Sequence, residues 1–230
     1  SYRKGGASAS INGESISKEA VMNKLHRLEF PALKTVEKKE LRTLYIDADE
    51  DHVALQYLEK KGDIRNPRIN TVMPWIIYVY EGVEGDEEGR PHLINPKYFG
   101  GVYDGQEAGG RLWTEVLEYL DEAYDLDAVE RIYINGDGAA WIRTGEKIIP
   151  KSKYALDKYH MHKYIIAATS HLEDSAEDAR GEIYRAIHRK KKWMAEGAFD
   201  RIIGITDKET KRKAVEQAKA YILGNWSGIM

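Results

Sequence analysis

Residues 131–142, RIYINGDGAAWI, combine a strand pattern with a charge at its end. Ile132, Tyr133 and Ile134 are β-branched and aromatic residues, which are typical of a buried strand. The run ends in Asp137, which has a glycine on each side. Glycines let a backbone or a phosphate group approach closely, so the pattern indicates a ligand site. An isolated GDG is also a frequent turn, in which the Asp makes local hydrogen bonds.

A second acidic pattern lies in residues 41–58, LRTLYIDADEDHVALQYL, which have the two-residue period of a strand. Asp47, Asp49 and Asp51 alternate with other residues and therefore share one face, with neighbours about 6.6 Å apart. Like charges on one face are costly when they are buried, and Asp is uncommon in strands. The stretch is either an exposed strand end or a place where carboxylates bind a cation.

The remaining strand patterns predict a sheet. We expect an antiparallel meander of three strands, at 41–58, 69–83 and 89–103. A helix should follow at about 110–124, with an apolar stripe made of Leu112, Val116, Leu117, Leu120 and Tyr124. A fourth strand is predicted at 129–138 and a short fifth strand within 147–160. A connection of strand, helix and strand implies a right-handed crossover and parallel pairing.

The two ends of the chain have helical patterns. At the start, Ser15 or Ser17 caps a short amphipathic helix. After a helix near 161–172, the pattern predicts two more helices, at about 175–195 and 207–223. The second of these would open with a capping box of Thr206 and Glu209.

This order of elements is that of the ribonuclease H-like α/β fold: a mixed sheet of three antiparallel strands, a helix and two further strands, followed by an all-helical insertion. We therefore predict a remnant of a helix-turn-helix DNA-binding segment and linker at 1–38, the catalytic core at 39–173 and the insertion at 174–230. In such a sheet the first and fourth strands are neighbours, so Asp49 and Asp137 would adjoin. Converging carboxylates of this kind bind pairs of Mg²⁺ ions about 3.5–4 Å apart.

Composition limits the chemistry. The chain has 230 residues, 42% of them hydrophobic and 32% charged, and its net charge of −3 does not decide whether it binds nucleic acid. It has no cysteine, which excludes thiolate metal sites and cysteine nucleophiles, so a metal would be Mg²⁺ or Mn²⁺ on carboxylates or histidine. It also lacks an apolar run of the roughly 20 residues that a membrane helix needs. We expect a cytoplasmic protein, associated with the nucleoid.

Two surfaces are candidates for DNA contact. Lys18, Asn23 and Lys24 would face the major groove if their segment is the second helix of a helix-turn-helix. A basic run with an adjacent aromatic residue, suited to phosphate contact and base stacking, is predicted in one helical stretch. It consists of Arg189, Lys190, Lys191, Lys192 and Trp193. Residues 208–213, KETKRK, repeat the pattern. Both surfaces would also be ordinary solvated helix faces.

Three stretches together resemble a known family: LYIDADEDHVALQ at 44–56, INGDGAAWI at 134–142 and LDKYHMHKYI at 156–165. In this order and separation they resemble the DDE transposases of bacterial insertion sequences, and most of all the ISLre-type branch of the Mutator-related group. The resemblance implies metal-dependent DNA cleavage at transposon ends, strand transfer into target DNA, and a homodimer or higher oligomer on the DNA.

The resemblance also implies roles for single residues. Asp49 matches the first catalytic acid, with Asp47 as the alternative, and Asp137 matches the second. Asp157 and His160 match a further motif of the family; His160 would assist catalysis and Asp157 would be accessory, by contacting DNA or orienting water.

The third acid of the family is a Glu on a helix beyond the helical insertion. Glu173, Glu177 and Glu182 are within reach in sequence but fall on polar helical faces, so we expect the third acid to lie beyond Met230, and the site in this chain to be incomplete. Two other functions remain open: a structure-specific nuclease or resolvase of the same fold, and a DNA-binding fragment without catalysis.

Overall fold

The computed structural model describes residues 16–27, 37–54, 71–103 and 108–229. Contacts divide the chain into two compact units, residues 1–37 and 38–230, which are described separately. The first contains helix α2 (Lys18–His26), and the predicted cap is confirmed for Ser17, whose Oγ accepts a hydrogen bond from the Ala20 amide at 3.1 Å. Ser15, the other possible cap, lies outside the described residues. No residue of α2 is buried.

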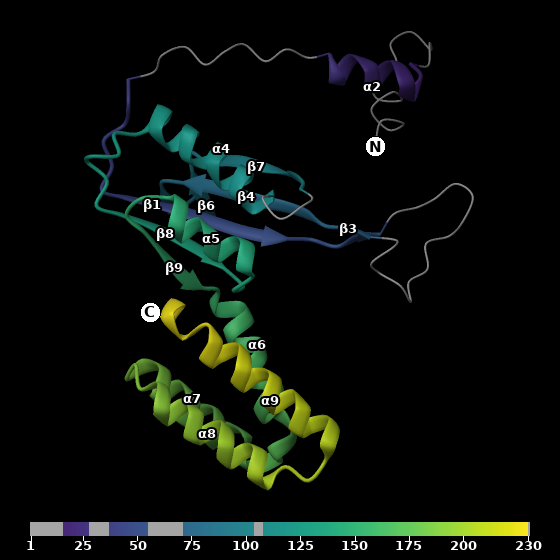
Figure 1. Ribbon diagram of the computed structural model, residues 1–230, viewed down its shortest axis with the longest axis vertical. Helices are drawn as coiled ribbons and strands as arrows, with labels where there is room; N and C mark the ends of the chain where they lie inside the picture. The colour runs from purple at the N-terminus through teal and green to yellow at the C-terminus, as the bar shows by residue number, and fades with distance from the viewer. Residues whose placement is uncertain (1–15, 28–36, 55–70, 104–107, 230) are drawn as a thin grey trace. The chain divides into compact units, whose positions relative to one another are not determined.

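The second unit is built on a mixed sheet of five strands (Figure 1). Their order is β7 (Lys97–Val102), β4 (Pro74–Tyr80), β1 (Thr43–Glu50), β8 (Arg131–Gly136) and β9 (Ser152–Leu156). β4 is antiparallel to β1 and β7, whereas β8 is parallel to β1 and β9. The predicted meander is therefore confirmed, and so is the prediction that the first and fourth strands, β1 and β8, are parallel neighbours.

Two short hairpins interrupt the predicted strands. They are formed by β2 (Val53–Ala54) with β3 (Thr71–Val72) and by β5 (Gly82–Gly85) with β6 (Pro91–Ile94). Among the described residues, the predicted strands at 41–58 and 89–103 are each divided into a sheet strand and one hairpin arm, and the predicted strand at 69–83 into a sheet strand with a hairpin arm on either side.

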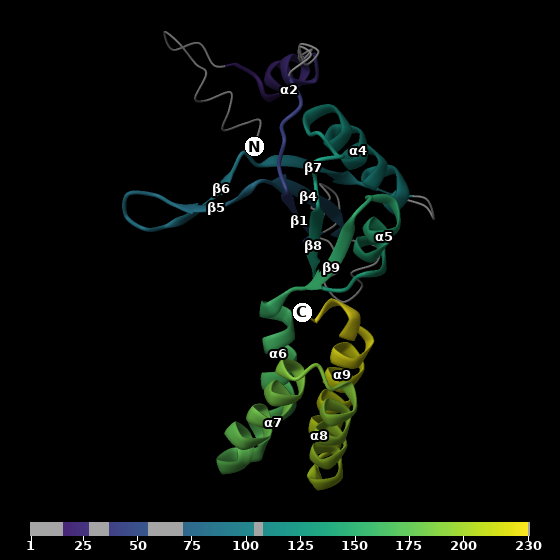
Figure 2. The same ribbon diagram turned by 90° about the vertical axis from the view of Figure 1, so that its left-hand side faces the viewer.

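One face of the sheet is covered by helices α4 (Ala108–Ala123) and α5 (Ala140–Ile148) (Figure 2). Alternate residues of β1 and β8, such as Ile46 and Ile134, are fully buried against these helices. Burial of each such side chain stabilises the fold by about 1.5–3 kcal/mol. The predicted stripe of α4 is confirmed, although Leu117 is only partly buried and the fully buried Trp113 was not predicted.

Helix α5 was not predicted. Its sequence is short and has a glycine at position 145, which lowers its helix propensity. The glycine is needed because the ring of Trp113 packs against it. A Cβ at position 145 would lie only 2.5 Å from the Cζ2 atom of Trp113. Packing against α4 therefore stabilises a helix that the local sequence does not specify.

Residues after β9 are helical among the described residues, with their own hydrophobic cluster that includes Ile183, Phe199 and Val215 (Figure 1). The elements are α6 (Lys158–Thr169), η1 (Ser170–Ser175), α7 (Ala176–His188), α8 (Lys192–Ile205), α9 (Glu209–Gly224) and η2 (Trp226–Gly228). None of the helices in the described ranges is long and apolar enough to cross a membrane.

Two predictions for these helices are wrong. The expected helix at 175–195 is broken at Lys190, which has a φ of 53° and reverses the chain between α7 and α8. Thr206 does not cap α9; its hydroxyl donates to the Ile202 carbonyl at 2.6 Å and lies 2.8 Å from His171 Nε2, so it closes α8 instead. Both errors arise because tertiary packing overrides a favourable local pattern.

Candidate functional site at the carboxyl ends of β1, β8 and β9

Three parallel strands end at one edge of the sheet: Asp49 is the penultimate residue of β1, and Asp137 and Asp157 directly follow β8 and β9. The register pairs Asp47 of β1 with Asn135 of β8, so Asp49 and Asp137 stand two residues further along neighbouring strands. The Asp157 amide, directly after β9, donates to the Gly136 carbonyl at 2.9 Å. The carboxyl ends of parallel strands are where open α/β sheets bind ligands.

Asp47 is hydrogen-bonded to side chains of two neighbouring strands. One of its carboxylate oxygens accepts hydrogen bonds from Asn135 Nδ2 at 2.5 Å and from the Tyr80 hydroxyl at 3.2 Å. Burial, followed by the charges of Asp47 and Asp49, raises the pKa of Tyr78 to about 12. Asp47 therefore belongs to a polar network on the sheet.

Asp49 is exposed at the end of β1. Its Oδ1 accepts a local hydrogen bond from the Glu50 amide at 2.9 Å. Glu50 points to the other face of the strand, where its carboxylate accepts a hydrogen bond from the Trp141 indole at the start of α5. This bond joins the residue after Asp49 to the helix that follows Asp137.

The loop of residues 136–139 holds Asp137, which is half-buried. Its Oδ1 accepts a hydrogen bond from the Ala139 amide at 2.9 Å. Gly138 has a φ of +99°, and a Cβ there would overlap the Asn225 carboxamide, while a Cβ on Gly136 would lie 2.8 Å from Ile142 Cγ2. The two glycines were expected to admit a ligand; they admit side chains of the protein itself.

Asp157 and His160 form the predicted pair at the start of α6. Asp157 caps the helix by accepting from the amides of Tyr159 at 3.0 Å and His160 at 3.2 Å, and its Oδ2 lies 2.6 Å from His160 Nδ1. Burial opposes the charged carboxylate, but these hydrogen bonds outweigh it and hold the pKa of Asp157 below its usual range. The pair thus has a clear structural role, and it orients the His160 ring.

The donors at this edge are of the kind that Mg²⁺ prefers, since carboxylate oxygens are its usual protein ligands. In the described part of the chain, however, no three His, Asp or Glu side chains lie close enough together to hold a metal ion. The structure therefore does not bring Asp47, Asp49 and Asp137 together as a set of three ligands. Asp49 and Asp137 supply two carboxylates, the donor type that such a cation prefers, from neighbouring strand ends.

The other acids considered from sequence lie away from the strand ends. Glu173 and Glu177 are exposed, and Glu182 is exposed and accepts a hydrogen bond from Arg201 at 2.6 Å. Glu173 belongs to η1, and Glu177 and Glu182 belong to α7, where their side chains are solvated.

The prediction that the basic run forms one helical stretch is wrong. Arg189 follows α7, Lys190 makes the reversal, and Lys192 begins α8. Its four cations are exposed and none is in an ion pair with another described residue, and Trp193 is 70% exposed. We call residues 189–193 the basic turn.

Two cavities, one at the acidic edge and one at the basic turn, share a lining residue. A cavity of about 530 Å³ is lined by Asp47, Asn135 and Asp157 and also by Ile187 of α7. A second cavity, of about 770 Å³, is lined by Ile187 together with Arg185, Arg189 and Lys190. One residue thus borders both cavities.

The other basic residues differ from the basic turn. In the segment 208–213, Arg212 and Lys213 pair with Glu209 at 3.5 and 3.6 Å. In α2, Lys18, Asn23 and Lys24 are exposed, and Lys18 lies 3.4 Å from Glu19. Part of the charge in each segment is therefore balanced locally.

The sequence pattern missed the tyrosines and the end of α9. Tyrosines of four strands stack side by side on the sheet face that carries Asp47, with ring centroids 5.4 to 5.9 Å apart: Tyr98, Tyr78, Tyr80, Tyr45 and Tyr133. Their alternate spacing, for example at 78 and 80, is a signal that could have found them. The contacts of Tyr221 and Asn225 with the loop of Asp137 have no such local signal.

Fold and site together define a mixed α/β protein with a five-stranded mixed sheet and aspartates at the ends of its parallel strands. The chain belongs to the Uncharacterised protein family (UPF0236), which it matches over residues 1–230.

Curated relatives come from Caldanaerobacter subterraneus subsp. tengcongensis. Two UPF0236 proteins of this bacterium are 39% and 38% identical to the chain over 218 residues, which is 94% of the chain and 43% of each relative. The name of the first joins eleven gene designations and that of the second joins four. The chain thus spans less than half the length of the curated relatives that it matches.

Among solved structures, the NurA nuclease from Sulfolobus solfataricus is similar over 83% of this chain and 45% of its own, at 13% identity. The TM-score is 0.19.

Proposed function

We propose that the chain is the catalytic core of a DDE transposase, which cleaves DNA at transposon ends and transfers the 3′-hydroxyl to target DNA. The observation that supports this most is the register of β1 and β8, which sets Asp49 and Asp137 at neighbouring strand ends. The strand order β7-β4-β1-β8-β9, in which only β4 runs opposite to the others, fits a ribonuclease H-like sheet.

Each proposed site residue has a distinct task. Asp49 and Asp137 would hold the divalent cations, Mg²⁺ or Mn²⁺, which supply Lewis-acid stabilisation of phosphate oxygens when bound. Asp47 is the weaker candidate for the first acid, because Asn135 and Tyr80 already occupy its carboxylate. His160, held through Nδ1 by Asp157, presents Nε2 for contact with a phosphate or a water molecule.

Two further observations support the proposal. Eleven gene designations for one relative are what an element that copies or moves itself within a genome would leave behind. The relatives are also more than twice as long as the matched region, which leaves room for a third acid elsewhere in the full-length protein.

The acids are tested by Asp49→Asn and Asp137→Asn in the full-length protein, with Asp51→Asn as the control. Asp51 is a nearby exposed acid whose carboxylate accepts from the His52 amide at 2.8 Å, and it lies beyond the strand. With Mn²⁺ and DNA that carries the element ends, we expect each site variant to lose at least a hundredfold in cleavage rate, and the control to remain within twofold. The magnitude corresponds to about 3 kcal/mol of transition-state stabilisation.

The products decide between the possible activities. Joined strands indicate a transposase, and hydrolysis without joining indicates a nuclease or resolvase. Cleavage that survives in Asp49→Asn or Asp137→Asn contradicts the site, and full-length protein that binds DNA but does not cut it favours a binding role.

The basic turn is the proposed DNA contact next to the acids, and the exposed side chains of α2 are a second contact surface. Each lysine that neutralises a phosphate contributes about 0.9 to the slope of log affinity against log salt. We therefore expect the triple variant Lys190→Gln, Lys191→Gln, Lys192→Gln to reduce this slope by about 2 to 3.

A matched control removes the same number of charges from the other basic segment, by Lys208→Gln, Lys211→Gln and Lys213→Gln. Because Glu209 already pairs with Lys213, this variant should change the slope less. The salt dependence of duplex DNA binding is measured by fluorescence anisotropy. An equal decrease of the slope in both variants would contradict a specific role for the basic turn.

A further inference from the structure

We propose that Tyr221 and Asn225, at the C-terminal end of α9, are positioning residues for Asp137. They hold the main chain of its loop from the helical part of the protein, so that the Asp137 carboxylate faces Asp49. This inference rests on the proposed function, since it assigns to Asp137 a cation that must be bound with a defined geometry.

Tyr221 contacts the loop through its hydroxyl, which donates to the Asp137 carbonyl at 2.5 Å, 84 residues away in sequence. Its ring stacks on Tyr164 of α6, with centroids 3.9 Å apart and planes inclined by 16°. A tyrosine hydroxyl has a reference pKa of about 10, so it is protonated and donates at neutral pH. The side chain is therefore held at both of its ends.

Asn225 completes the contact on the other side of the loop. It is 8% exposed, and its Nδ2 donates to the Tyr221 carbonyl at 3.0 Å. Its carboxamide occupies the space where Gly138 lacks a Cβ. The positive φ of Gly138 and this close approach together make glycine necessary at that position.

The hydrogen bonds to the Asp137 loop also set the direction of the Asp137 side chain. The carbonyls before and after the Asp137 Cα both accept a phenol hydroxyl: Gly136 from Tyr154 at 3.0 Å and Asp137 from Tyr221 at 2.5 Å. These two peptide planes set the direction of the Asp137 Cα–Cβ bond. Tyr154 belongs to the sheet, whereas Tyr221 belongs to α9, so the helical part supplies one of the two supports (Figure 1).

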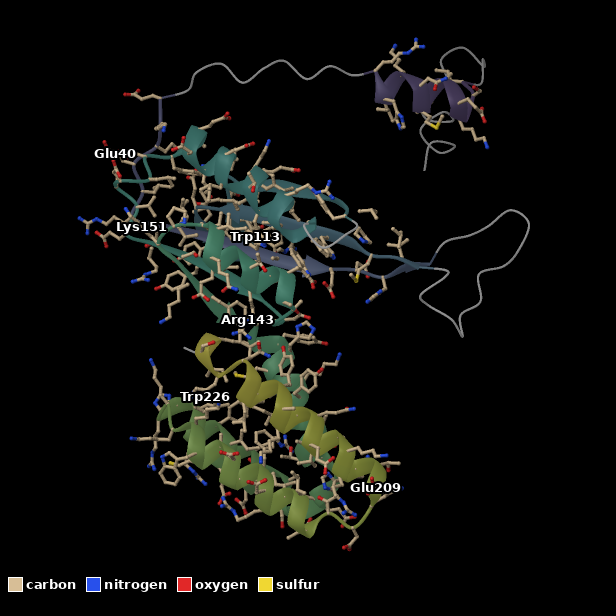
Figure 3. The ribbon with its side chains drawn as sticks, in the orientation of Figure 1. Glu40, Trp113, Arg143, Lys151, Glu209 and Trp226 are labelled. Carbon is tan, nitrogen blue, oxygen red and sulfur yellow. The ribbon has the colours of Figure 1, made fainter. Side chains whose placement is uncertain are left out.

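A neighbouring side chain reinforces the first support. Arg143 of α5, which is labelled in Figure 3, lies over the ring of Tyr154, 5.8 Å from the ring centroid. The hydrogen bond from Tyr154 does not use the Tyr221 hydroxyl, so removal of that hydroxyl should loosen the loop without unfolding it. Supporting groups of this kind typically change metal affinity 10- to 100-fold.

The test compares Tyr221→Phe with Tyr164→Phe in the full-length protein. Both variants lose one hydroxyl from the same stacked pair, but the Tyr164 hydroxyl has no hydrogen bond within the described residues, whereas that of Tyr221 bonds to the loop. Isothermal titration with Mn²⁺ gives the affinity without catalysis, and cleavage at varied Mn²⁺ gives the half-saturating concentration. Duplex binding and the melting temperature are measured for both variants.

We expect Tyr221→Phe to weaken Mn²⁺ binding about tenfold and to raise the half-saturating Mn²⁺ by the same factor, while DNA affinity stays unchanged. Tyr164→Phe should stay within twofold of the wild type. Asn225→Ala, which keeps the Tyr221 hydrogen bond, should weaken Mn²⁺ binding by a smaller factor, and it serves as the decisive variant should Tyr221→Phe fold poorly.

Wild-type Mn²⁺ dependence in Tyr221→Phe and Asn225→Ala, with Asp137→Asn inactive, overturns the positioning role and leaves the proposed function intact. Equal losses in Tyr221→Phe and Tyr164→Phe overturn it as well, because the stack rather than the hydrogen bond would then be responsible. Wild-type cleavage by Asp137→Asn overturns both proposals.

Discussion

Asp49 and Asp137 end neighbouring strands with the same charge, yet their surroundings differ. Asp49 is exposed, and its carboxylate accepts a hydrogen bond from the next residue of its own strand. The main chain of the Asp137 loop is contacted by Tyr154 from β9 and by Tyr221 and Asn225 from α9. Local geometry therefore places one acid, and tertiary packing places the other.

The difference has a physical cause in the path of the chain after each strand. Beyond Asp49 the chain continues into the β2 hairpin arm, and strand alternation alone sets the direction of the side chain. Beyond β8 it must turn into α5, which requires a positive φ at Gly138 and supports for the loop. Glycine adopts this φ without strain, and the side chains of Tyr154, Tyr221 and Asn225 contact the loop from neighbouring elements.

The largest expected effect comes from Gly138→Ala. Alanine would have to adopt an unfavourable positive φ, and its Cβ would overlap Asn225. We therefore expect a loss of about 3 kcal/mol in the free energy of unfolding. Asp49→Asn, at the exposed strand end, should stay within about 0.5 kcal/mol of the wild type. Urea denaturation of both variants measures the contrast, and similar stabilities would mean that the two strand ends are equally tolerant.

A smaller effect is expected from Asp157→Ala at the third strand end. Loss of the cap of α6 should cost about 1 kcal/mol, because two amides lose their acceptor. The exposed Asp121→Ala, whose carboxylate pairs with Lys38 at 3.5 Å, is the control and should cost less.

The stability difference between the wild type and Asp157→Ala should become smaller as the pH falls. Because the pKa of Asp157 in the folded protein is below its ordinary value of 3.8, the stability that its charge adds is fully present above that pH. It is lost as the pH falls through the lowered pKa. Thermal melts between pH 3 and 7 check this, and a difference that grows toward low pH would contradict the assigned hydrogen bonds.

Some elements could not be predicted because their sequences favour another structure. The run at 189–193 suits a helix, but Lys190 adopts a φ of 53° and lets α7 and α8 pack through Ile183 and Phe199. Helix α5 depends on Trp113, whose indole donates to the Trp141 carbonyl at 2.8 Å from another helix. In both places the decisive partner is distant in sequence.

Residue alternation is a local property of a strand, so the sequence was sufficient to predict the strands of the sheet, the acids near their ends and the face that Asp47 and Asp49 share. It therefore indicated Asp49, Asp137 and the pair of Asp157 and His160 as neighbours at one edge. Only the tertiary structure decided what surrounds them: the occupied carboxylate of Asp47, the turn at Lys190 and the supports of the Asp137 loop. These depend on contacts between residues far apart in the chain, for which the local sequence carries no signal.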